Sequence, residues 1–193
     1  MCRRKARPGL LLLILFVAVV LAGPAAAQRV RSDLAPMITF FSAVKDGDVD
    51  AVKEELGKGA RVNAFDDNGK TPLVYAVMAG NQELVEVLLE GGALVDFRDE
   101  TGNTGLIWAA EQGDVEIAEI LIAVGAVIDN QNRRGETPLI KAAQHDRRRM
   151  LRFLIEGGAD VNLNDFTGRS PLVWAEGART RGAAKILKAA GAE

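Results

Sequence analysis

The chain has 193 residues, of which 48% are hydrophobic and 26% are charged. This composition is typical of a globular protein and excludes a wholly disordered chain. Aromatic residues make up only 5% of the sequence, so the core must consist mainly of Ala, Leu, Val and Ile, as in proteins built from helical repeats.

Residues 1–27 have the layout of a secretory signal peptide. A basic start is followed by an unbroken apolar run of 13 residues, Leu10 to Ala22, and then by a Gly-Pro break and small residues. We expect cleavage after Ala27, so that the mature chain begins at Gln28. A retained membrane anchor is the alternative, but a span needs about 20 apolar residues and this run is shorter.

The mature chain is acidic and free of thiols. Removal of the signal segment takes away the only cysteine and four basic residues, which leaves 20 basic and 26 acidic residues and a net charge of −6. A chain without cysteine suits an oxidising compartment, and we expect the periplasm of a bacterium. Residues 28–37 are expected to form a short N-terminal tail before the folded domain.

From residue 38 onward the sequence repeats with a period of 33 residues, which is the strongest signal it contains. A glycine, a hydroxyl residue, a leucine and an alanine recur at this spacing. The members of these four columns are Gly69, Gly102, Gly135 and Gly168; Thr71, Thr104, Thr137 and Ser170; Leu73, Leu106, Leu139 and Leu172; Ala76, Ala109, Ala142 and Ala175. We number the expected units 1 to 5, with units 1 and 5 as caps, over approximately residues 38–65, 66–98, 99–131, 132–164 and 165–193.

Each unit predicts two helices joined by a tight turn. In unit 2, Thr71 can cap a free backbone N–H and Pro72 fits the first helical position, so a short helix is expected near 72–79. A second helix with an apolar stripe follows and ends at Gly91-Gly92. Because one helix pair cannot bury its own apolar face, stacked copies must share a continuous core. The sequence therefore predicts an all-α solenoid of five helix-turn-helix units with β-turn tips.

The segment GKTPLVYAVMAGNQELVEVLLEGGALVD resembles an ankyrin repeat, and so does GETPLIKAAQHDRRRMLRFLIEGGADVN. The resemblance covers about residues 38–193 and implies an ankyrin-repeat solenoid that serves as a protein-binding scaffold. Two departures from the family pattern matter. Asp146 replaces an inter-helix glycine, at a position where a left-handed conformation is expected. The family often has His after the Thr-Pro-Leu run, and we expect apolar packing instead at Val74, Ile107, Ile140 and Val173.

Residues that could support catalysis are scarce in the mature chain. His145 is the only histidine, and Ser170 is expected to cap a helix, so a Ser-His-Asp triad would need another serine. A zinc site needs several His or Cys ligands, and the acidic run at 46–50 does not match a calcium loop. The glycines recur at the repeat period and form no phosphate-binding loop. We therefore expect no enzyme activity, no catalytic residue, no cofactor and no metal site.

Charge is distributed unevenly along the chain. Residues 28–130 hold 19 acidic and 8 basic residues, a net of −11, whereas residues 131–193 hold 7 acidic and 12 basic residues, a net of +5. Such polarity can orient a charged partner during approach. Arg133-Arg134 and the arginines at 147–152 form a basic patch. It is interpreted as a solvated face or a contact for an acidic protein or anionic lipid; nucleic acid would need a broader positive stripe.

In an ankyrin stack, the turn tips and the first helices line a concave face. By register, the partner-binding candidates are Phe65, Lys70, Arg98, Trp108, Arg133, Arg134, Phe166, Arg169 and Trp174. Aromatic residues and arginine supply most binding hot spots, and the two phenylalanines at turn tips are the preferred anchors. Tyr75, Trp108 and Trp174 share one column with Lys141. Two interpretations of this column stay open: packing between adjacent first helices, and contact with a partner.

These observations predict a monomeric periplasmic adaptor that binds a folded protein. No nucleic acid partner and, after signal cleavage, no membrane association are expected. The alternative is a regulator of a periplasmic enzyme, either an inhibitor or a factor that supports an oxidative-stress enzyme. A hydrolase is a third hypothesis, and it lacks a visible nucleophile.

Overall fold

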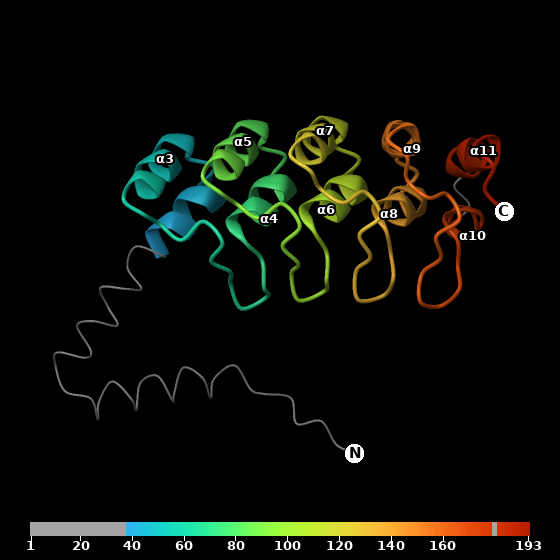
Figure 1. The fold of residues 1–193 in the computed structure, drawn as a ribbon, viewed down its shortest axis with the longest axis horizontal. Coiled ribbons are helices and arrows are strands. Elements are labelled where there is room, and N and C mark those ends of the chain that lie inside the picture. Colours follow the sequence, from blue (N-terminus) through green and yellow to red (C-terminus); the bar gives the residue numbers. More distant parts are fainter. Residues whose placement is uncertain (1–37, 179–180) are drawn as a thin grey trace, which may run out of the picture.

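The computed structural model describes residues 38–178 and 181–193, and the regular elements of this part are helices (Figure 1). Residues 38–46 form the first described helix. The others are α3 Val49–Gly57, α4 Pro72–Met78, α5 Gln82–Glu90, α6 Gly105–Gln112, α7 Val115–Ala123, α8 Pro138–Gln144, α9 Arg148–Glu156, α10 Pro171–Gly177 and α11 Arg181–Ala189. The predicted signal peptide, its expected cleavage site at Ala27 and Gln28, and the expected tail at 28–37 lie outside the described residues.

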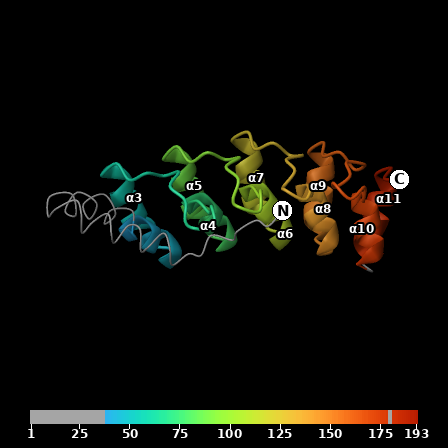
Figure 2. The same ribbon diagram turned by 90° about the horizontal axis from the view of Figure 1, so that it is seen from below.

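The helices form two parallel rows. The outer row holds α3, α5, α7, α9 and α11, and the inner row holds the helix at 38–46, α4, α6, α8 and α10 (Figure 1). Each inner helix from α4 to α8 packs against the next inner helix, and the stack is elongated (Figure 2). The turns between units project from the inner row, on the side away from the outer row. No helix of the described part is long and apolar enough to cross a membrane.

The apolar core runs between the two rows along the stack. Leu73 and Leu106 from the inner row and Leu88 and Leu121 from the outer row are each at most 2% exposed. Burial of one such side chain contributes about 1.5–3 kcal/mol, so the shared core holds neighbouring units together. The predicted alanine column is fully buried and lets neighbouring inner helices approach closely; its members are Ala76, Ala109, Ala142 and Ala175. The continuous core expected from the sequence is confirmed.

Hydroxyl side chains begin the inner helices, as predicted. Thr71 accepts a hydrogen bond from the backbone N–H of Val74 at 3.3 Å, and the equivalent residues of the later units do the same. The later caps are Thr104, Thr137 and Ser170. In α6 the helix starts at Gly105 in place of proline, still under its threonine cap.

Apolar packing occupies the column in which the family often has histidine. Val74, Ile107 and Ile140 are at most 1% exposed, as expected. Val173 differs, because it lies on α10, the last inner helix, and 47% of it is exposed. The expectation is therefore confirmed for three units and wrong for unit 5.

Asp146 takes the left-handed conformation that the sequence predicted. Its φ is +51°, and it is the only non-glycine residue with positive φ in the described part of the chain. Gly80 and Gly113 hold the equivalent positions in units 2 and 3, with φ of +68° and +83°. An aspartate tolerates this conformation better than most residues, so the turn between α8 and α9 keeps the same shape.

Candidate partner-binding surface

Main-chain hydrogen bonds join neighbouring turn tips into one row. The N–H of Glu100 donates to the carbonyl of Asn68 at 3.0 Å, and the later tips are joined in the same way, by Arg133 to Thr101 and by Phe166 to Arg134. Glycines permit the close approach: a Cβ on Gly102 would lie 2.7 Å from the backbone nitrogen of Arg133. The tips therefore form a connected surface, and their side chains are held in fixed relation.

Inside each tip, one side chain shapes the turn. Oδ1 of Asp99 accepts hydrogen bonds from the N–H groups of Thr101 and Asn103, at 2.8 and 3.0 Å. Asp66, Asn132 and Asp165 repeat this pattern at the 33-residue period. Sequence reasoning recognised the turns but did not identify this column, although its regular spacing was a usable signal.

The aromatic column is tied to these turn residues. The indole N–H groups of Trp108 and Trp174 donate to Oδ2 of Asp99 and Asp165, at 2.9 and 2.8 Å. The Tyr75 hydroxyl donates to the equivalent Asp66 at 2.6 Å. The rings are half-buried, and their N–H and O–H groups are satisfied inside the protein, as expected for side chains that pack between neighbouring elements. Partner contact through the exposed part of each ring stays a prediction.

These hydrogen bonds displace two pKa values in opposite directions. Burial raises the pKa of Asp165, but hydrogen bonds from Thr167, Arg169 and Trp174 outweigh burial and lower that pKa to about 2. The hydrogen bond to Asp66, together with burial, raises the pKa of Tyr75 to about 12. The lowered pKa keeps the Asp165 carboxylate ionised as an acceptor, and the raised pKa keeps the Tyr75 hydroxyl protonated as a donor.

Cations lie over the same rings. Nζ of Lys70 is 5.3 Å from the centroid of the Trp108 ring, and the Arg169 guanidinium is 4.9 Å from that of Trp174. At such distances a cation is attracted to the ring face. Four of the predicted site residues are thus brought together as two cation–aromatic pairs along the inner helices.

In unit 4, a buried lysine that pairs with two glutamates stands where units 2, 3 and 5 have an aromatic ring. Lys141 occupies the aromatic column with a side chain only 7% exposed, and its Nζ lies 2.8 Å from Glu111 Oε2 and 4.0 Å from Glu136 Oε2. Glu136 also accepts hydrogen bonds from Asn132, Arg134 and Gln144. Burial raises the pKa of Glu136, but these hydrogen bonds and the Lys141 charge outweigh it, so the pKa falls below its ordinary value.

The exposed aromatic residues stand at the tips. Phe65 is 59% exposed and its ring centroid lies 5.9 Å from that of Phe97; Phe166 is 70% exposed and its ring rests against Gly135. Arg98 donates to the carbonyl of Gln131 and to the Asn130 side chain. Exposed rings held on a rigid backbone are suited to insertion into a partner.

Two shallow hollows between the tips bring four predicted residues together. One, of about 390 Å³, is lined by Phe65, Phe97, Arg98 and Arg133, and the next, of about 630 Å³, by Arg98, Arg133 and Phe166 among others. We call these five residues the tip surface. The Arg133 guanidinium has no hydrogen-bond or ion-pair partner among the described residues. Arg134 instead pairs with buried Glu136, at 2.7 Å.

Comparison with known protein families identifies the repeat. A family described as ankyrin repeats (3 copies) matches residues 40–132, and one described as ankyrin repeats (many copies) matches residues 125–172. The chain belongs to the ankyrin-repeat family. Its ankyrin repeats indicate a scaffold for protein–protein interaction, and ankyrin-repeat proteins are generally non-catalytic. A search of the curated proteins finds no match to the chain.

The two residues considered for catalysis, Ser170 and His145, contact other parts of this ankyrin-repeat chain. The Ser170 hydroxyl caps α10 and donates to the carbonyl of Glu193 at 3.3 Å. His145 is exposed at the end of α8, with Nε2 3.9 Å from Glu111 Oε1. Within the described ranges, no three His, Cys, Asp or Glu side chains are grouped as metal ligands would be.

Proposed function

We propose that the protein is a non-catalytic scaffold that binds a folded protein partner through its tip surface and the adjoining concave face. One observation carries this proposal: two exposed phenylalanines flank two arginines on a row of turns joined by main-chain hydrogen bonds. Aromatic and arginine side chains are the residue types that dominate binding energy in protein interfaces. A rigid backbone also reduces the conformational entropy lost on binding.

The chemistry of the tip surface limits the partner. Each phenylalanine offers about 1.5–3 kcal/mol if a partner pocket buries it fully. Arg133 has no internal partner among the described residues and is available to a carboxylate of the bound protein. A suitable partner therefore carries apolar pockets beside acidic side chains.

The signal-like segment at 1–27 supports the periplasm as the place of action. In that compartment the alternative role is regulation of an enzyme, as an inhibitor or as a factor supporting an oxidative-stress enzyme. Addition of the purified chain to a captured enzyme separates the two roles. Passive tethering leaves the enzyme's rate unchanged, whereas regulation alters it. N-terminal sequencing of the mature protein tests cleavage after Ala27.

Affinity capture from a periplasmic extract tests the binding surface. Wild type is expected to retain a partner that Phe166→Ala and Arg133→Glu lose. Arg134 is left unchanged because its substitution would expose the buried Glu136 network. Val124→Ala, an apolar truncation in the outer row, serves as the control and is expected to capture normally.

The captured protein then allows affinity to be measured. Loss of a hot-spot phenylalanine costs about 2 kcal/mol, or roughly thirtyfold in Kd. If Phe166→Ala and Arg133→Glu bind the same protein as tightly as wild type does, the tip surface is not the binding site.

A further inference from the structure

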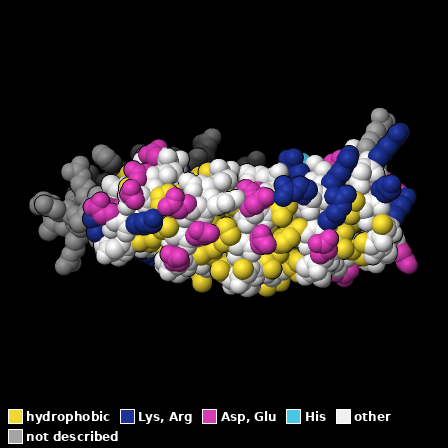
Figure 3. Space-filling model, turned by 90° about the horizontal axis from the view of Figure 1, so that it is seen from above, with side chains coloured by type: hydrophobic (Ala, Val, Ile, Leu, Met, Phe, Trp, Pro, Cys, Tyr) yellow, Lys and Arg dark blue, Asp and Glu magenta, His cyan; other side chains and the backbone are white. Residues whose placement is uncertain are grey.

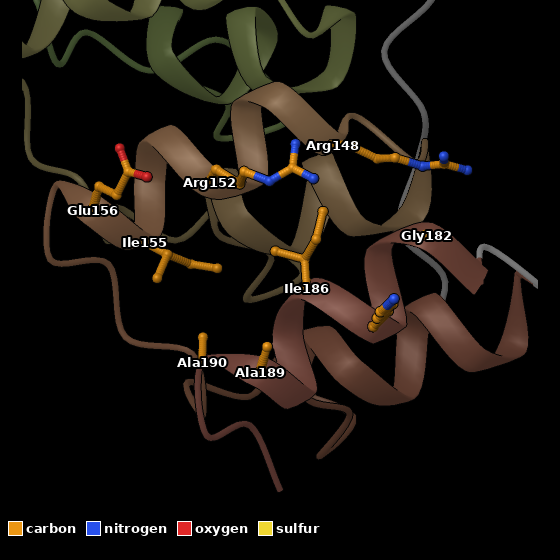
Figure 4. A pocket seen from close by; sticks show the side chains of 9 residues that line it. Arg148, Arg152, Ile155, Glu156, Gly182, Ile186, Ala189 and Ala190 are labelled. Atoms are coloured by element: carbon orange, nitrogen blue, oxygen red, sulfur yellow. The ribbon is translucent and has the colours of Figure 1, made fainter.

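A groove with a basic rim lies between α9 and α11 on the outer row (Figure 4). It has a volume of about 610 Å³. Ile155, Ile186 and Ala190 supply its apolar floor, and Arg152 extends over the opening between the two helices. Lys185 lines the other side. Glu156 is the one acid among the described residues that line the groove. The groove therefore combines a recessed apolar strip with a rim on which cations outnumber acids.

The repeat provides an internal comparison for this groove. Two periods earlier, between α5 and α7, a groove of about 520 Å³ is built from residues in the same register. Leu89 corresponds to Ile155 and Ile120 to Ile186, but Glu86 stands where the later groove has Arg152. The apolar floor is thus a property of the fold, whereas the basic rim is specific to the α9/α11 groove.

The outer row shows the same contrast in charge. Seen from above, Lys and Arg gather over the end that carries α9 and α11, whereas Asp and Glu are spread over the rest (Figure 3). The side chains of Arg152 and Lys185 have no hydrogen-bond or ion-pair partner within the described part of the chain. Unpaired cations beside an apolar strip lose no internal contact when an anionic partner binds.

Gly182 keeps one edge of the groove open. The equivalent residue in unit 3 is Glu116, an acid that pairs with Arg149 at 3.0 Å. A Cβ on Gly182 would collide with the guanidinium of Arg148, which lies across this glycine. The missing side chain therefore makes room for the guanidinium of Arg148, which also pairs with Asp146 at 2.7 Å.

We propose that the α9/α11 groove binds an acidic amphipathic helix of a partner protein. Carboxylates on the flanks of such a helix would pair with Arg152 and Lys185, and its apolar face would insert between Ile155 and Ile186. Helices commonly bind in grooves in this way. The two isoleucines are only half-buried and recessed, so the ligand must bring protruding apolar side chains. A lipid surface would instead require apolar side chains that protrude from the protein.

The test uses the mature chain and a synthetic, fluorescently labelled peptide with leucines along one helical face and glutamates on both flanks. Fluorescence anisotropy is expected to show saturable one-to-one binding that weakens as salt is added. Arg152→Glu/Lys185→Glu is expected to bind roughly tenfold more weakly or worse. Lys53→Glu/Arg61→Glu makes the same change of net charge at the far end and is expected to bind like wild type.

Two further measurements are included. The first distinguishes the effect of groove shape from that of groove charge, and the second distinguishes binding in this groove from binding at the tip surface. Ala189→Trp fills the groove without changing its charge and is expected to abolish binding, while a scrambled peptide without a leucine face is expected not to bind. Phe166→Ala/Arg133→Glu is expected to retain full affinity for the peptide, so this proposal and the tip-surface proposal fail independently.

Several results would overturn the proposal. They are absence of saturable peptide binding, equal affinity for the scrambled peptide, and equal affinity of Arg152→Glu/Lys185→Glu for the peptide. Vesicles of phosphatidylglycerol provide the last arm. Vesicle binding that this double variant loses, with no peptide binding by wild type, would assign the groove to anionic lipid instead.

Discussion

The indole N–H of Trp174 donates a 2.8 Å hydrogen bond to Oδ2 of Asp165, and this bond fastens the last inner helix to the last turn tip. Oδ1 of the same carboxylate accepts the N–H groups of Thr167 and Arg169. One side chain therefore orders the turn and orients the ring. Because Phe166 follows directly after Asp165, the exposed anchor of the tip surface depends on this carboxylate for its position.

Asp165→Asn is expected to destabilise the chain at neutral pH. The folded-state pKa of Asp165, about 2, is depressed below its ordinary value, so the stabilisation is present above about pH 4 and is lost as pH falls through the folded pKa. The shift corresponds to about 2 kcal/mol. Urea unfolding at pH 7 should show this deficit for the variant, and the deficit should shrink toward pH 2. A deficit that grows on acidification would contradict the assignment.

Tyr75 offers a direct spectroscopic check, because it is the only tyrosine in the chain. The folded-state pKa of Tyr75 is about 12, above its ordinary value, so the contribution of its bond to Asp66 is complete below pH 10 and is lost as pH rises through 12. Tyrosinate absorbance should therefore appear at higher pH in the folded chain than in an unfolded chain. Asp66→Asn, which removes the carboxylate charge, should move the midpoint back toward 10. Circular dichroism at each pH establishes that the chain is still folded.

Local rules were sufficient for the elements, but not for the side-chain contacts that join one element to another. Thr71 and Pro72 define the start of α4 by capping chemistry that depends only on neighbouring residues. The bond between Trp174 and Asp165 joins residues nine apart across a turn, and its geometry is not fixed by either helix alone. A signal was present in unit 4, where Asn132 and Lys141 replace both members of the pair together.

The Glu111–Lys141 pair was harder to predict from the sequence, because it joins consecutive inner helices across 30 residues. In the preceding units the same relation places Lys45 over Tyr75, at 4.8 Å from the ring centroid. In both pairs, a residue of one unit is chemically matched to the residue that it faces in the next unit. That coupling becomes visible only when the stacking of α6 on α8 is known.

Lys141→Met is expected to cost about 2 kcal/mol, because it removes the cation at 2.8 Å from the partly buried Glu111 and leaves the nearly buried Glu136 with Arg134 alone. Lys53→Met provides the matched control. Lys53 pairs with Glu83 at 3.3 Å, but both side chains are more than half exposed, so its loss should cost less than about 1 kcal/mol. Urea unfolding of both variants at neutral pH measures the difference. Similar small losses would mean that the unit 4 network contributes no more than a surface pair.

Asp146 caps a helix in the neighbouring unit. In units 1 to 3 the outer helices are capped by Asp48, Asn81 and Asp114, whereas α9 follows Arg147 and has no side-chain cap. Asp146 instead directs Oδ1 to the N–H of Ala183 in the first turn of α11, at 2.9 Å. The residue thus combines a left-handed turn with a bond between units 4 and 5.

Three substitutions separate these two roles of Asp146. Asp146→Asn keeps an acceptor and tolerates positive φ but loses the partly exposed ion pair with Arg148, so it should cost less than about 1 kcal/mol. Asp146→Gly suits the turn but loses the cap, which should cost about 1 kcal/mol, and Asp146→Ala loses both and should be the least stable. Hydrogen exchange should locate the loss in α11 while α5 stays protected. If Asp146→Gly proved more stable than wild type, relief of backbone strain would outweigh the cap, and the bond to Ala183 would contribute little to holding the last unit in place.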